Sequence, residues 1–196
     1  MTSHVEDDGR GALSISGARF LLIRPETLVA LQKALEASLG WEAAEYLATG
    51  GRAGGARATA SLPGDREARV QRLVETGAAL GWGRFAVETL SAERLVITVE
   101  RSPFAEAYGP SATPVCHITR GVLESLAAAT LGGTPRMVET ACAAIGDPRC
   151  RFESSGMGGA SRPPHVPPGS PGVSPASPHV PPGSPGVSPP VPPIPV

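Results

Sequence analysis

Apolar residues in the first part of the chain recur at the spacing of amphipathic helices. Leucines stand three and four positions apart over residues 28–39, after Pro25, which a first helical turn accepts, and before Gly40, which can end a helix. A second, short helix is expected over residues 41–51, where two glycines would stop it. A mobile connection of small residues is expected over residues 52–65.

The period of the pattern then changes from helical to alternating. A third helix is expected over residues 66–80, and Gly77 on its apolar face indicates close packing, since glycine weakens a helix by about 1 kcal/mol relative to alanine. Residues 83–90 and 94–100 alternate with period two, which predicts an antiparallel hairpin.

A fourth helix and a second hairpin complete the pattern. The helix is expected over residues 113–131, with Thr113 as its N-cap and Ile118 and Val122 on its buried side. Residues 136–153 are expected to form two strands around a Gly-Asp-Pro turn. The order of the expected elements predicts an α+β fold with a helical layer packed on an antiparallel sheet. This order is three helices, two strands, one helix and two strands.

Composition divides the chain into three parts. Residues 154–196 hold 15 of the 22 prolines and a single charge, so they cannot bury enough apolar surface to offset ordering and are expected to form a disordered tail. The tail contains PHVPPGSPGVSP twice, at 164–175 and 178–189, which suits either a spacer or an extended strip for a partner with an aromatic groove. Residues 1–12 are expected to be a flexible polar arm, which leaves one domain over residues 13–153.

Charge and hydropathy exclude several classes of protein. Residues 1–153 carry 16 basic and 18 acidic side chains with no basic stripe, which argues against nucleic-acid binding. No apolar run approaches the roughly 18 residues that span a bilayer. The N-terminal sequence MTSHVEDDGRG lacks the apolar segment of a signal peptide, so we expect a cytoplasmic protein with reduced thiols.

Three cysteines and one glutamate form the candidate site. Cys116 is expected in the first turn of the fourth helix, and Glu139, Cys142 and Cys150 on the second hairpin, with spacings of 23, 3 and 8. From spacing alone, a metal site, inert buried thiols and redox chemistry all stay open. Residues 139 and 142 would point to opposite faces of a regular strand, so a shared site needs a bulge or a strand end between them. His117 is expected to turn about 100° away from Cys116.

The stretches ERSPFAEAYG, PVCHITRGVLESLAAATLGG and VETACAAIGDPRCRF resemble the 4-vinyl reductase, or hydrocarbon-binding, domain family. The family is similar to the sensor module of aromatic-responsive, enhancer-dependent activators. The resemblance implies a structural zinc ion on Cys116, Glu139, Cys142 and Cys150. It also implies a fold like the small subunits of the vesicle-tethering complex, often dimeric, around an apolar cavity.

The chain departs from the phenol sensors at their ligand site. The tryptophan of their W-x-N-S run corresponds to Val99, and no histidine stands in residues 66–80, so a more apolar ligand than phenol is expected. Candidate lining residues are Leu73, Phe85, Val99 and Phe104, each of which plain core packing also explains. Trp41 and Trp82 are expected to pack at helix ends.

Three functions remain open from the sequence. With four protein ligands the implied zinc has no position left for substrate, and no nucleotide fingerprint is present, so we expect a non-enzymatic protein. The first function is a stand-alone small-molecule binding or sensor domain that acts through a partner. The second is a tethering-like homodimer that uses the proline-rich tail as a docking arm. The third is an accessory protein in tetrapyrrole or other hydrophobic-metabolite biosynthesis.

Overall fold

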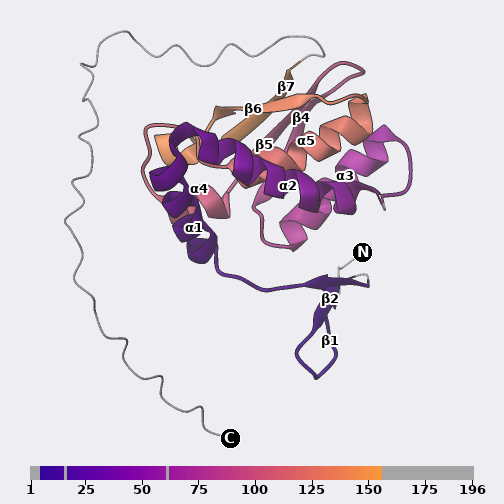
Figure 1. Cartoon of the computed structure of the whole chain (residues 1–196). Coiled ribbons are helices and arrows are strands. Elements are labelled where there is room, and N and C mark those ends of the chain that lie inside the picture. Colours follow the sequence, from indigo (N-terminus) through magenta and orange to yellow (C-terminus); the bar gives the residue numbers. More distant parts are fainter. Residues whose placement is uncertain (1–4, 16, 61, 156–196) are drawn as a thin grey trace, which may run out of the picture. The chain divides into compact units, whose positions relative to one another are not determined.

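The computed structural model describes residues 5–15, 17–60 and 62–155 (Figure 1). Helices pack on one four-stranded antiparallel sheet, which confirms the predicted α+β class. The strands, in the spatial order β4-β5-β7-β6, are β4 (Arg84–Leu90), β5 (Leu95–Glu100), β7 (Cys150–Ser155) and β6 (Arg136–Ala141).

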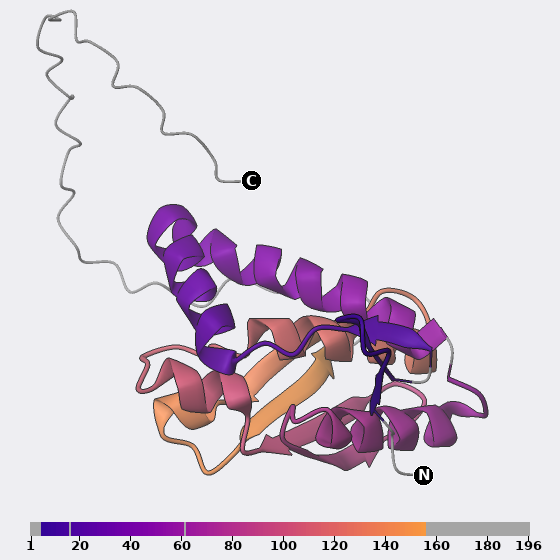
Figure 2. The same cartoon turned by 90° about the horizontal axis from the view of Figure 1, so that it is seen from below.

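Five α-helices and two short 3₁₀ turns lie within the described residues. They are α1 (Pro25–Leu39), η1 (Gly40–Glu42), α2 (Ala43–Ala60), α3 (Arg66–Ala79), α4 (Pro103–Tyr108), α5 (His117–Leu131) and η2 (Ala143–Ile145). Figure 2 shows α5 lying on the sheet and α2 lying along α5, on the side away from the strands. None of these helices is both long and apolar enough to cross a membrane.

The hydrophobic core lies between the sheet and the helices α3 and α5. The central strand β5 is buried from Leu95 to Val99, and along β7 every second residue is buried, as expected for a strand with one covered face. On the helices, Val70 and Leu73 of α3 and Leu123 of α5 join the same cluster. The predicted apolar face of the third helix is confirmed, and Gly77 lies against the ring of Phe85.

Helix α2 is longer than the sequence indicated. The expected stop at Gly50 and Gly51 is wrong, since α2 continues to Ala60 through the expected connection. The reason is close packing against α5: a Cβ at Gly51 or Gly55 would clash with the backbone of α5, and a Cβ at Gly121 would clash with the backbone of α2. Here glycines that weaken an isolated helix allow two helices to approach closely.

Helix α1 has its predicted ends, but only part of its leucine stripe is covered. Leu28 packs against the core and Leu35 is half-buried. Leu31 and Leu39 are exposed, whereas the polar Gln32 is 1% exposed. Trp41 is 86% exposed, so its expected packing role is wrong. Trp82 does pack, with its ring 5.4 Å from that of Phe104 in an edge-on arrangement.

Helix α5 starts later than predicted, and α4 was not expected. The N-cap is Cys116 instead of Thr113, because the amide of Gln32 binds the carbonyl of Val115 at 3.0 Å and the hydroxyl of Ser111 accepts the amide of Thr113 at 3.2 Å. These bonds hold the segment in an irregular course up to Cys116. Of the residues expected on the buried side, Ile118 and Val122 are half-buried and pack against the core, next to the fully buried Leu123.

The two ends of the domain differ from expectation in small ways. Within the expected arm, Val5–Asp7 forms β1, which pairs with β2 (Leu13–Ile15), and β2 pairs with β3 (Ala18–Phe20) in a separate antiparallel sheet. At the other end, β7 continues through Ser155, two residues into the expected tail. The rest of the expected disordered tail, with both copies of the repeat, lies outside the described residues.

Candidate metal centre

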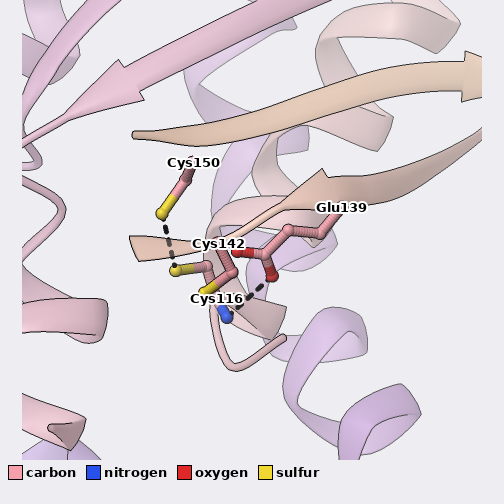
Figure 3. Close-up of side chains that lie close together, drawn as sticks. All are labelled: Cys116, Glu139, Cys142 and Cys150. Atoms are coloured by element: carbon pink, nitrogen blue, oxygen red, sulfur yellow. Dashed lines mark hydrogen bonds between the residues drawn. The ribbon is translucent and has the colours of Figure 1, made fainter. Parts of the chain in front are cut away.

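Four side chains from three parts of the fold converge at one end of the sheet (Figure 3). Cys116 stands at the N-terminus of α5, Glu139 lies on β6, Cys142 follows β6, and Cys150 begins β7. Their sulfur and carboxylate oxygen atoms all lie within 4.8 Å of one another. The structure therefore brings together the four residues that the resemblance implied.

A bulge allows Glu139 and Cys142 to share this site. The pairing of β6 with β7 shifts register between Glu139 and Ala141, and Cys142 lies just beyond the strand end. The extra residue reverses the alternation of side chains, so residues three apart reach the same side. The distortion expected from the spacing is confirmed.

The Gly-Asp-Pro turn fixes the positions of the two hairpin cysteines. The carboxylate of Asp147 accepts a hydrogen bond from the backbone amide of Cys142 at 2.8 Å. Gly146 has a φ of 107°, a region that L-residues rarely adopt, so glycine is needed at this point of the turn. The amide of Ala143 then donates to the sulfur of Cys150 at 3.4 Å.

The site is buried, and one of its oxygens lacks a partner. All three cysteines are 0% exposed and free, with 3.6 Å between the sulfurs of Cys116 and Cys150. The amide of Cys116 donates to Oε2 of Glu139 at 2.9 Å, whereas Oε1 of Glu139 is buried and has no hydrogen-bond partner among the described residues. A buried carboxylate oxygen without a partner is costly, and a cation among these groups would remove that cost.

The ionisable groups of the site shift one another's pKa values. Burial, and then the nearby Cys142, raise the pKa of Glu139 to about 8. Hydrogen bonds with Cys142 and Cys150 raise the pKa of Cys116, whereas the bond from Cys116 lowers the pKa of Cys150 to about 4. Four acidic groups in one dry site cannot all ionise alone, and a divalent cation would favour their deprotonated forms.

These observations fit a metal ion. Three sulfurs and one carboxylate oxygen supply four donors, the number that a closed tetrahedral site needs. His117 is not one of them; it is half-buried, and burial, followed by the charge of Arg120, lowers its pKa. This agrees with its expected position as a neighbour of the site.

The four candidate ligand-binding residues lie together in the core. Leu73, Val99 and Phe104 belong to one buried cluster, and the half-buried Phe85 packs against it. Hollows of about 330 Å³ and 350 Å³ lie elsewhere in the described part, the first between α2, α3 and α5 and the second beside Trp41. Neither hollow is lined by any of these four residues.

Two groups of polar residues were missed by the sequence reasoning. The first is Ser102, which is 2% exposed and has its hydroxyl 3.4 Å from the sulfur of Cys116. A serine directly before a proline at a helix start is an N-cap signal that could have identified the short helix α4. The second is Glu124, 3% exposed, which accepts from Arg52 at 2.5 Å and from Arg120 at 3.0 Å, and so ties α2 to α5.

Comparisons with known proteins support the family resemblance. Residues 95–155 match the sequence model of the 4-vinyl reductase domain, which confirms the resemblance to that family. No curated protein matches the chain.

Solved structures that are similar to this chain include the following two. One is the crystal structure of the phenol-responsive sensory domain of the transcription activator PoxR with phenol, with a TM-score of 0.69 and 22% identity, covering 78% of this chain and 84% of that one. The other, a vinyl-4-reductase family protein from Methanocaldococcus jannaschii, has a TM-score of 0.45 and 13% identity, covering 72% of this chain and 100% of that one. Neither is a vesicle-tethering subunit, so the expected likeness to those subunits is unsupported.

Proposed function

We propose that this protein is a small-molecule binding or sensor domain that is stabilised by a structural zinc ion and acts through a partner protein. The observation that carries the proposal is the buried donor set of three cysteines and Glu139, within a fold similar to a phenol-responsive sensory domain. The match of residues 95–155 to the 4-vinyl reductase domain supports it. The sensory neighbour is a regulatory domain, which favours a non-enzymatic role for this chain.

Zinc is the metal that this donor set suits best. Thiolate sulfur with one carboxylate is a ligand combination that zinc accepts, and the reduced thiols match the expected cytoplasmic location. When bound, the ion would supply four strong bonds that join the start of α5 to both strands of the β6–β7 hairpin. With all four donors from the protein, no position remains for a substrate, so the role proposed for the metal is structural.

The proposed ligand site is the core region around Leu73, Phe85, Val99 and Phe104. These side chains are apolar and, in this structure, pack against one another and against Trp82. A ligand would have to displace part of this packing, and the half-buried Phe85 at the edge strand β4 is the member nearest to solvent. Because the four side chains offer no hydrogen-bonding group, the ligand class is an aromatic or aliphatic hydrocarbon without an essential hydroxyl.

Native mass spectrometry and thermal unfolding test the ligand proposal. Toluene, naphthalene and phenol are added in turn to the full chain, and the midpoint of unfolding is measured for each. A hydrocarbon that binds only the folded state raises the midpoint of unfolding. At a concentration one hundred times its dissociation constant it stabilises the folded state by about 2.7 kcal/mol. No shift with any of the three compounds, and no small molecule retained on purification, would contradict a ligand in this core.

A second proposed function is a homodimeric interaction module. The observation in its favour is the apolar surface on α1, η1 and α2, where Leu31, Leu39, Trp41 and Tyr46 are 57%, 38%, 86% and 62% exposed. Contiguous exposed apolar side chains of this kind mark interaction sites. We propose a second copy of the chain as the occupant, and light scattering of the full chain tests it by mass.

A further inference from the structure

We propose that Ser102 is a positioning residue of the metal centre, which donates a hydrogen bond from its hydroxyl to the sulfur of Cys116. The inference rests on the zinc site proposed above and adds a residue to it. The two atoms are 3.4 Å apart, and Ser102 is 2% exposed, so water does not compete for the hydroxyl.

The backbone around Ser102 holds the side chain in this place. Strand β5 ends at Glu100, and Arg101 has a φ of 56°, a conformation that costs free energy for any residue other than glycine. This single residue turns the chain from the sheet into α4. Ser102 follows as the N-cap and Pro103 as the first helical residue, whose fixed φ favours the helix start. A strained residue next to a buried polar contact is consistent with a functional constraint on that contact.

The direction of the hydrogen bond follows from the chemistry of a metal-bound thiolate. A thiolate has no proton, so it can only accept, and the hydroxyl of Ser102 has to donate. The same hydroxyl oxygen accepts a hydrogen bond from the amide of Ala105 at 3.5 Å as the cap of α4, which uses one lone pair and leaves its proton for Cys116. Cys150 has a comparable donor in the amide of Ala143. Such outer hydrogen bonds orient the ligand atoms of a metal site.

The bond also connects the metal centre to α4 and the aromatic core. Helix α4 carries Phe104, whose ring packs edge-on against Trp82, and Tyr108, whose hydroxyl donates to Glu36 of α1 at 2.6 Å. Because the N-cap of α4 contacts a metal ligand, loading the site would stabilise the start of this helix. Metal binding should therefore alter the environment of Trp82, although Trp82 lies outside the donor set.

The test compares three variants of the full chain by competition for Zn²⁺ with a chelator and by the sulfur-to-metal absorption of the Co²⁺ form. Ser102→Gly keeps most of the capping preference but removes the donor, since glycine at an N-cap costs only a few tenths of a kcal/mol. Ser102→Thr keeps the hydroxyl. Ser91→Gly is the matched control, because the Ser91 hydroxyl also bonds nearby backbone amides, in the β4–β5 turn, whereas Cys150 pairs with Val99 at the other end of β5.

We expect Ser102→Gly to bind Zn²⁺ about 10- to 100-fold more weakly and to shift the Co²⁺ absorption, as for other outer-shell partners. Ser102→Thr and Ser91→Gly should stay within about 3-fold of the unchanged chain. Equal affinity of Ser102→Gly and the unchanged chain would overturn the role of Ser102. If the unchanged chain itself binds no Zn²⁺, the proposed metal site fails instead, so the two failures are distinguishable.

A measurement on the unchanged chain covers the case in which Ser102→Gly does not fold. With the site loaded with the NMR-active isotope of cadmium, the hydroxyl proton of Ser102 should exchange slowly and correlate with the metal through the sulfur of Cys116. A loaded site without that correlation would contradict the hydrogen bond. The near-ultraviolet circular dichroism of Trp82 should also change on Zn²⁺ binding, and less so in Ser102→Gly.

Discussion

The metal corner, which is the site of Cys116, Glu139, Cys142 and Cys150, and the layer formed by α1 and α2 differ in how well their structures could be predicted from the sequence. At the metal corner, Cys116, Glu139 and the two hairpin cysteines are buried together as the motif implied. In the α1–α2 layer two of the four leucines in the stripe of α1, Leu31 and Leu39, are exposed, and the glycines expected to end α2 lie inside that helix. A motif of cysteines and a glutamate indicates which side chains come together. A periodic pattern of apolar residues indicates only that one face of the helix is covered, and not by what.

The largest expected effect tests the metal corner. Cys150→Ser removes one donor and should lower the free energy of unfolding by about 4 kcal/mol or more, because the binding free energy of a structural metal is part of the folding free energy. Denaturant unfolding with parallel zinc analysis measures both losses. His117→Gln is the control, since this neighbour is not a donor and should retain zinc. Full stability of Cys150→Ser would contradict a structural metal.

The next largest effect tests the α2–α5 contact. Gly121→Ala places a Cβ against the backbone carbonyl of Ala48, which cannot move aside, so we expect a loss of about 3 kcal/mol. Gly54→Ala is the matched variant, because Gly54 is also helical but has open space around it, and it should gain up to about 1 kcal/mol. Thermal unfolding of both variants measures the difference. Equal effects would show that α2 and α5 are not packed this closely.

Metal binding should release protons in an amount that identifies the donors. The raised pKa values of Cys116 and of Glu139, the latter about 8, keep both groups protonated near neutral pH without metal. Since a metal binds the deprotonated forms, binding should release protons from at least these two groups and weaken as the pH falls. Calorimetry in buffers of different ionisation enthalpy counts them. Glu139→Gln should release about one proton fewer; an unchanged count would remove Glu139 from the donor set.

The smallest effect on stability is expected on the exposed face of α1. Leu31→Glu should change the free energy of unfolding of the monomer by less than about 0.5 kcal/mol, since Leu31 is 57% exposed. It should nevertheless lower the mass measured by light scattering, because it places a charge in the proposed dimer surface. Leu73→Ala, in the buried core, is the contrast and should destabilise the fold by about 2 kcal/mol or more. A monomeric unchanged chain would refute the dimer.

The two hairpins and α3 were predictable because local patterns determine them, whereas the cluster of three cysteines and Glu139 was implied by a family resemblance and left open by spacing alone. Alternation with period two and the Gly-Asp-Pro turn are properties of a few neighbouring residues. The length of α2 and the exposure of Leu31 were not predictable, since they depend on how closely α5 approaches and on which surfaces meet. The late start of α5 depends on the bond from Gln32 to Val115, two residues that are 83 positions apart. No local pattern contains such a contact.

The central claim is that Cys116, Glu139, Cys142 and Cys150 hold one structural metal ion. It is tested most directly by elemental analysis of the full chain purified without added zinc, before and after exhaustive treatment with a chelator. The account predicts about one zinc per chain at first, and loss of cooperative unfolding once the metal is removed. A chain that is free of metal from the start and unfolds cooperatively with undiminished stability would contradict it.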